Sequence, residues 1–228
     1  MLQKFLQRIA IEFPFLSKIN QPNFPFDSHH RNLAKKYEDI DLYLEFYDSV
    51  RKKLNNFTEK TINFQNNLKF GSKTKSVKRK LLKPLADHQS EGLLKTEILL
   101  YKKSYRGFSA MTEFHFYENK LFYIECNLGN LSNRERTELL DEIKGFYDVK
   151  FNATENLKIT NTHDYIMSIE NLSEFKIIYA DTGNDFFKEL ENIEIFYNKR
   201  ESSGQVLLNS TSFHGNEEEN IEKIKGTL

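Results

Sequence analysis

The stretch TEILLYKKSYRGFSAMTEFHFYENKLFYIECNL, residues 96–128, decides the fold. Apolar or aromatic side chains alternate with polar ones along most of it, which is the two-residue period of half-buried β-strands. Gly107 and the polar run Glu118-Asn119-Lys120 interrupt the alternation and are typical turn residues. The stretch therefore predicts an antiparallel meander of three strands, at Thr96–Tyr105, Phe108–Tyr117 and Leu121–Leu128.

A single register assigns the side chains of this meander to two faces of the sheet. Phe114, Phe116, Phe122 and Ile124 are expected in the core. The alternate residues are expected on an exposed face, whose mixture of aromatic and charged side chains suits a protein interface. This candidate binding face comprises Met111, Glu113, His115, Tyr117, Tyr123 and Glu125.

Helices and further strands extend the pattern on both sides of the meander. A short helix is predicted for Lys75–Lys83, and Ser132 with Glu135 forms a capping-box pattern that predicts a helix to Tyr147. Three extended runs and a last helix follow, at residues 156–160, 164–170, 174–181 and 185–197. Because this order of two helix-plus-three-strand units lacks parallel crossovers, it favours an α+β fold with an antiparallel sheet and helices on one face.

The N-terminal part of the chain shows helical periodicity. Apolar residues recur in steps of three and four from Leu2 to Phe13 and from Leu33 to Leu54, which predicts a first helix and a long helix over residues 28–55. We expect the two to form a helical hairpin ahead of the sheet, or to pair with a second copy of the chain in a homodimer. The predicted organisation is a helical segment at 1–58, an α+β domain at 59–200, and an edge strand with an acidic tail at 201–228.

Composition argues against several classes of protein. Lys and Arg together number 33, as do Asp and Glu, and this zero net charge argues against nucleic-acid binding by the whole surface. The single cysteine, Cys126, excludes an internal disulfide and suits a reducing compartment. No run reaches the ~18 apolar residues of a membrane span, and the N-terminus lacks the pattern of a cleavable signal. A cytoplasmic protein without a membrane span is therefore expected.

A basic segment, Lys69–Lys83, precedes the meander. Three interpretations of its helix remain open: a solvated face, a docking surface for an acidic protein, or a binding site for nucleic acid or a phosphate ligand. The turn at Gly71 lacks the second glycine of a Walker A loop, so no nucleotide cradle is predicted. The candidate basic patch comprises Lys75, Arg79, Lys80 and Lys83.

Few residues in the sequence suggest catalysis. Asp27, His29 and His30 carry metal-binding groups, but adjacent histidines point in different directions and no spaced third ligand follows. Glu113 and His115 share a strand face and could form an acid–base pair, although the polar face of a half-exposed strand explains the same pattern. We therefore predict no catalytic residue, metal ligand or cofactor, and a metal-dependent hydrolase is the weakest alternative.

The order of short motifs in residues 69–128 is similar to that of a known group of domains. It consists of Phe70-Gly71-Ser72, then Val77, Leu81 and Lys83-Pro84, and finally Tyr101 and the run FHFYENKL. This order resembles the small α+β domains related to the outer-membrane assembly lipoproteins and the beta-lactamase-inhibitor proteins. The resemblance implies a fold that presents a sheet surface to another protein, without catalysis.

These observations predict a non-catalytic protein-binding module of the inhibitor or immunity type. It would bind another protein, whose identity the sequence does not indicate, through an exposed sheet face. The alternative is binding of nucleic acid or a phosphate ligand through the basic patch.

Overall fold

The computed structural model of this chain describes residues 26–37, 40–52, 56–64, 68–90, 94–150 and 157–202. The predicted first helix, the hairpin that it would form and the predicted tail beyond residue 202 lie outside the described residues. The described helices are α2 (Phe26–Lys36), α3 (Asp41–Lys52), α4 (Thr74–Leu81), α5 (Asn133–Tyr147) and α6 (Asp185–Ser202). The described strands are β1 (Asn56–Phe57), β2 (Ala86–Gln89), β3 (Thr96–Tyr105), β4 (Phe108–Tyr117), β5 (Lys120–Asn127), β6 (Leu157–Thr160), β7 (Tyr165–Asn171) and β8 (Phe175–Asp181).

The eight strands form one sheet in the order β1-β6-β7-β8-β5-β4-β3-β2. All the pairings are antiparallel except that of β1 with β6, so the prediction of an α+β fold with an antiparallel sheet is confirmed. At the centre β5 pairs with β8, with a register from Tyr123 opposite Ala180 to Asn127 opposite Lys176. The strands after α4 and those after α5 therefore join into one continuous sheet, each group contributing its last strand to the central seam.

One core lies between the sheet and the helices α4 and α5. Phe114 and Phe116 of β4 project into it, and we call this side of the sheet the first face. Val77 of α4 and Leu139 and Ile143 of α5 meet them there. The α5 helix begins as predicted, because Ser132 and Glu135 complete the capping box that satisfies the N-terminal backbone groups.

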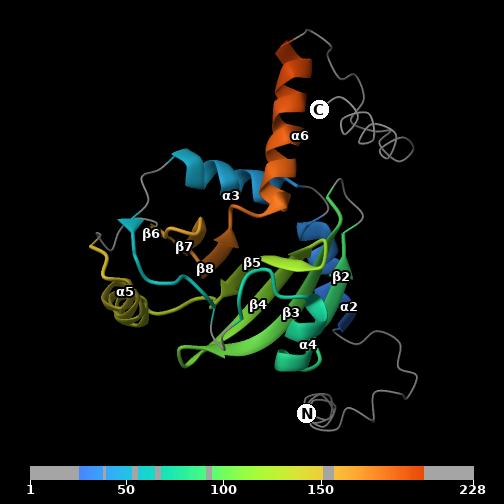
Figure 1. The fold of residues 1–228 in the computed structure, drawn as a ribbon. Coiled ribbons are helices and arrows are strands. Elements are labelled where there is room, and N and C mark those ends of the chain that lie inside the picture. Colours follow the sequence, from blue (N-terminus) through green and yellow to red (C-terminus); the bar gives the residue numbers. More distant parts are fainter. Residues whose placement is uncertain are drawn as a thin grey trace, which may run out of the picture.

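The prediction that the helices cover only one face is wrong. A second core lies on the opposite side of the sheet, which we call the second face, and α2, α3 and α6 cover it. Phe186 of α6 stacks on Phe122 of β5 with ring centroids 4.1 Å apart, and Arg51 of α3 lies 3.2 Å from Glu191 of α6. Figure 1 shows α6 projecting from the sheet beside α3. The physical reason is that both faces of the central strands carry large apolar side chains, and each needs its own cover.

The long helix predicted over residues 28–55 is two helices, α2 and α3. A straight helix of that length would extend about 42 Å, whereas a break lets both segments lie against the sheet. Tyr37 follows α2 directly, and Tyr43 and Phe46 of α3 are buried with it. Leu33, Tyr37 and Val50 of the predicted apolar series are buried as expected. Ile40, Leu44 and Tyr47 of that series are only partly buried, and Tyr43 and Phe46 of α3 are buried instead.

A β-bulge changes the predicted faces of β5. The register between β4 and β5 shifts between His115 and Phe116, so that Phe116 lies opposite Leu121. Phe122 therefore joins the second core with Tyr123, whereas Leu121 takes the place predicted for Phe122 in the first core. A bulge inserts one extra residue into the ladder and so reverses the alternation on one side of it.

The aromatic stack between α6 and the sheet generates the first prediction. Replacing Phe186, which is fully buried, by Ala should lower the free energy of unfolding by about 3–5 kcal/mol, because a large cavity would remain. The matched control is Phe57→Ala, since Phe57 is 56% exposed and should contribute less than about 1 kcal/mol. Chemical denaturation measures both variants, and equal losses would contradict the packing of α6 on the second face.

Candidate functional site

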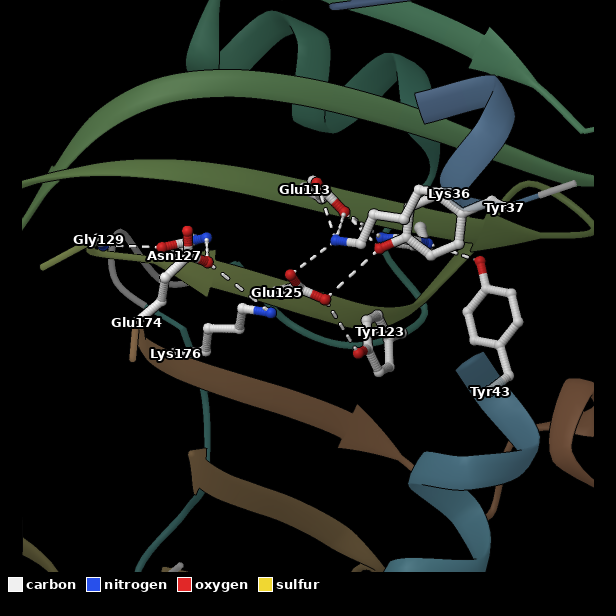
Figure 2. A network of polar contacts seen from close by, with 11 residues as sticks. Lys36, Tyr37, Tyr43, Glu113, Tyr123, Glu125, Asn127, Gly129, Glu174 and Lys176 are labelled. Atoms are coloured by element: carbon white, nitrogen blue, oxygen red, sulfur yellow. Dashed lines mark hydrogen bonds and ion pairs between the residues drawn. The ribbon is translucent and has the colours of Figure 1, made fainter. Parts of the chain in front are cut away.

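A group of polar side chains lies between α2, α3 and the centre of the second face. The helices contribute Lys36 from the end of α2, the adjacent Tyr37, and Tyr43 from α3. The sheet contributes a carboxylate and an imidazole from β4, and a tyrosine and a second carboxylate from β5 (Figure 2). We call this group the central cluster; it comprises Lys36, Tyr37, Tyr43, Glu113, His115, Tyr123 and Glu125.

Lys36 joins the two carboxylates of the cluster. Glu113 and Glu125 are directly opposite each other on β4 and β5, so their negative charges repel across the ladder. The Lys36 Nζ atom donates to Glu113 Oε2 at 3.0 Å and to Glu125 Oε1 at 2.7 Å. The side chains of Glu113 and Glu125 are only 13% and 9% exposed, against 30% for Lys36. The ion pairs therefore lie in a poorly solvated place, open to water on the side of Lys36.

Tyrosine hydroxyls complete the hydrogen bonding of the cluster. The hydroxyl of Tyr37 donates to Glu113 Oε2 and lies 3.5 Å from Glu125 Oε2. Tyr123 donates to Glu125 Oε2 at 3.5 Å. The hydroxyl of Tyr43 lies 2.7 Å from Nδ1 of His115. Burial raises the pKa of Tyr37, Tyr43 and Tyr123, so these side chains act as neutral hydrogen-bond donors.

The electrostatics of the cluster keep opposite charges on Lys36 and Glu113. Burial by itself would raise the pKa of Glu113, but the nearby His115, the charge of Lys36 and the hydrogen bond from Tyr37 outweigh burial and lower the pKa. Burial likewise disfavours the charged form of Lys36, yet Glu125 and Glu113 raise the pKa of its amine. For His115, complete burial dominates and lowers the pKa, so the imidazole is neutral at neutral pH.

The expectation that the candidate binding face is exposed is wrong for most of its residues. His115, Tyr123 and Glu125 are buried, and Glu113 is largely covered beneath α2. Met111 and Tyr117, at the two ends of the β4 part of the face, are half-exposed. The physical reason is that Tyr37, Tyr43 and Phe46 of the cover need an apolar surface to pack on, and the aromatic residues of β4 and β5 provide it.

An accessible part of the second face lies beside the central cluster, one row of residues along the strands from Glu113 and Glu125. Register pairs connect its members in turn across five neighbouring strands, from β3 through β4, β5 and β8 to β7. One of its side chains is exposed and the others are half-exposed. We call this row the open strip; it comprises Lys102, Met111, Asn127, Lys176 and Glu170. Met111 is the residue that the open strip shares with the predicted binding face.

The residues of the candidate basic patch lie together on and just after α4, on the outside of the first face. Lys75, Arg79, Lys80 and Lys83 are all exposed. Lys78, which the prediction did not include, is half-buried and donates to Asp87 at 2.6 Å and to Glu97 at 3.0 Å.

Asp27, His29 and His30, which carry metal-binding groups, lie at the beginning of α2. The structure describes the half-exposed side chain of His29 but not the side chains of the other two residues. In the described part of the chain, no group of three or more His, Cys, Asp or Glu side chains is arranged to hold a metal ion. Cys126 is buried on the first face, and burial raises its pKa to about 12.

Sequence reasoning missed Lys36, Tyr37 and Tyr43 as members of the cluster. Tyr37 belongs to the helical periodicity, but a stripe of this kind indicates burial without showing what it covers. Lys36 stands beside it in a helix that also carries Lys35, and the sequence does not distinguish the paired lysine from the exposed one.

The fold and the cluster define a mixed α+β protein whose sheet is covered on both faces, with an ionic cluster under one cover. Comparisons with protein-family models, with curated proteins and with solved structures find no match for the chain. The resemblance of residues 69–128 to the lipoprotein and inhibitor domains stays a prediction. Among the described helices, none has both the length and the apolar character that crossing a membrane requires.

The bridging role of Lys36 generates the second prediction. Lys36→Met should lower the free energy of unfolding by about 3 kcal/mol, because two largely buried carboxylates would face each other without a cation. Lys35→Met is the matched control, since Lys35 is exposed on the same helix and should change stability by less than about 0.5 kcal/mol. Urea denaturation at pH 7 provides the comparison.

A second substitution tests the cause of that loss. Adding Glu113→Gln to Lys36→Met removes one of the two unpaired charges, so the double variant should regain part of the lost stability. If Lys36→Met proves as stable as Lys35→Met, the ion pairs of Lys36 contribute nothing to the fold.

Proposed function

We propose that this protein is a non-catalytic protein-binding module of the inhibitor or immunity type, and that it binds its partner through the open strip of the second face. The single observation that carries the proposal is the strip itself, a row of accessible side chains that crosses five adjacent strands on a face whose centre is packed under α2, α3 and α6. The proposal therefore retains binding through a sheet face but places it one row away from most of the residues expected from the sequence, with Met111 common to both.

The geometry of the open strip suits a protein partner. Five adjacent strands span about 19 Å from the first to the last, which is the scale of a protein interface and not of a small-molecule cleft. The strip is held by a rigid support, because Leu128 and Phe175 anchor the same strands in the first core. A rigid backbone loses little backbone conformational entropy when its surface binds a partner.

The chemistry of the strip is mixed. Lys102 and Lys176 offer cationic groups, Glu170 offers a carboxylate, and Met111 is an adaptable apolar contact. Asn127 donates from Nδ2 to Glu174 Oε2 at 2.7 Å and its Oδ1 accepts from the backbone N–H of Gly129 (Figure 2). Met is enriched in protein interfaces, and the charged groups around it would lie at the polar rim of the contact.

A second candidate function rests on the exposed cations of α4. Lys75, Arg79 and Lys80 are all exposed on one helix of eight residues, which could attract a nucleic acid or a phosphate ligand by local charge. The two candidates occupy opposite faces of the sheet, so separate variants can distinguish them.

The third prediction compares two variants of the whole chain. Met111→Arg with Lys176→Glu changes the open strip, and Lys75→Glu with Arg79→Glu changes the basic patch. Both variants, together with the unchanged chain, are used to capture a partner from a lysate of the native source, and the captured protein is then titrated. The strip variant should weaken binding at least about tenfold, because a like-charge juxtaposition across an interface costs several kcal/mol and about 1.4 kcal/mol is a factor of ten. The patch variant should bind as the unchanged chain does.

The same variants test the alternative. Binding to a mixed oligonucleotide pool that decreases with salt and is lost only in the patch variant would favour the second candidate and reject the strip. Thermal unfolding of both variants serves as the control, since a strip variant with an unchanged melting temperature excludes a general loss of structure as the cause.

A further inference from the structure

The helices α2 and α3 with Tyr37 between them, which we call the α2–α3 cover, exclude solvent from the imidazole of His115. His115 is 0% exposed. The rings of Tyr37, Tyr43 and Tyr123 surround it, with centroids 4.7, 5.7 and 4.9 Å from the imidazole centroid. Two of these three rings come from the cover, and only the third comes from the sheet. Water can therefore reach His115 only if the cover moves.

The polar contacts of His115 suit the neutral imidazole. Its Nδ1 has the Tyr43 hydroxyl at 2.7 Å, and its Nε2 lies 3.5 Å from Glu113 Oε2 but makes no hydrogen bond. A neutral ring has one donor and one acceptor, whereas an imidazolium has two donors and would need two good acceptors. In the closed arrangement the second acceptor is too distant to replace the water that the charged ring would lose.

The charged and titratable groups that face His115 come from every element around it. Lys36 of α2 opposes a second positive charge, while Glu113 of β4 and Glu125 of β5 favour one. The tyrosines of the adjacent turn, of α3 and of β5 are neutral, because burial raises the pKa of each. Burial is the largest effect on His115 and outweighs the two carboxylates, so its pKa is lowered.

We propose that the α2–α3 cover opens locally as the solution becomes acidic, because protonated His115 is stable only where water reaches it. Such opening would expose Glu113, His115 and Tyr123 beside the open strip and so enlarge the accessible part of the second face. The consequence for a partner rests on the proposed function, whereas the opening itself does not.

The direction of the effect follows from proton linkage. The pKa of His115 is lowered from its ordinary value of 6.5 while the cover is closed, so below that pH the open state binds more protons and gains population. With an ordinary pKa in the open state, the ratio of open to closed molecules should rise up to about tenfold between pH 7.5 and pH 5.5. The pKa of Glu113 is lowered in the closed state, so its contribution to the stability of that state is fully present above its ordinary pKa of 4.5 and is lost only as the pH falls below that value.

Amide hydrogen exchange of the full chain at pH 7.5 and pH 5.5 tests the proposal, with rates corrected for the intrinsic effect of pH. Amides of α3 should be less protected than those of α5, which lies on the first face, and their protection should fall up to about tenfold at the lower pH. In His115→Gln the pH dependence of α3 should disappear, since glutamine does not titrate. Equal protection of α3 and α5 at both pH values would show global unfolding alone and would overturn the proposal.

If His115→Gln does not fold, a pH titration of the imidazole resonances in the unchanged chain tests the proposal. The imidazole resonances of His115 in the closed state should remain those of the neutral ring down to pH 5.5. A titration with a midpoint near 6.5 and undiminished α3 protection would show that the ring accepts a proton under the closed cover, and the proposal would be wrong. Retention of the full pH dependence of α3 in His115→Gln would reject it equally.

Discussion

Two carboxylates that face each other on neighbouring strands are the constraint on which the second layer of this protein depends. Glu113 and Glu125 would be an unfavourable pair on a bare sheet, and the cation that separates them belongs to a helix. The apolar contacts of Leu33, Phe46 and Val50 supply the bulk of the packing energy of that layer. Apolar contacts are not directional, so the ion pairs of Lys36 add what the apolar surface lacks, a single preferred position for the end of α2 over the sheet.

The strands could be predicted where the pattern is local. The observed limits of β3 and β4 are those expected from the alternation of residues 96–117 and from the turn at Gly107. The strands β1 and β2 could not be predicted, because they are short and exist only by pairing at the sheet edges. The bulge beside Phe116 and the break after α2 depend on distant contacts, and a periodic pattern contains no information about them.

The central cluster could be predicted only in part. An acid and a histidine at alternate positions of β4 look the same on a solvated strand and under a helix. One signal did indicate the second cover, namely the run Leu121-Phe122-Tyr123-Ile124 in β5. Four apolar or aromatic residues in succession are typical of a strand that is buried on both faces. Which helix would supply the cover, and which of its lysines would point inward, depends on tertiary packing.

The parallel pairing of β1 with β6 limits how far the cover can travel. Asn56 is held opposite Ile159 shortly after α3 ends, and Lys158 of β6 also donates to Ser49 Oγ at 2.9 Å. These contacts hold the C-terminal end of α3 at the sheet edge, and the ion pairs of Lys36 hold the C-terminal end of α2 over the centre of the sheet. The opening that we propose would therefore leave the C-terminal end of α3 in place at the sheet edge. The cover would then close again within the same molecule, so its closing would not depend on protein concentration.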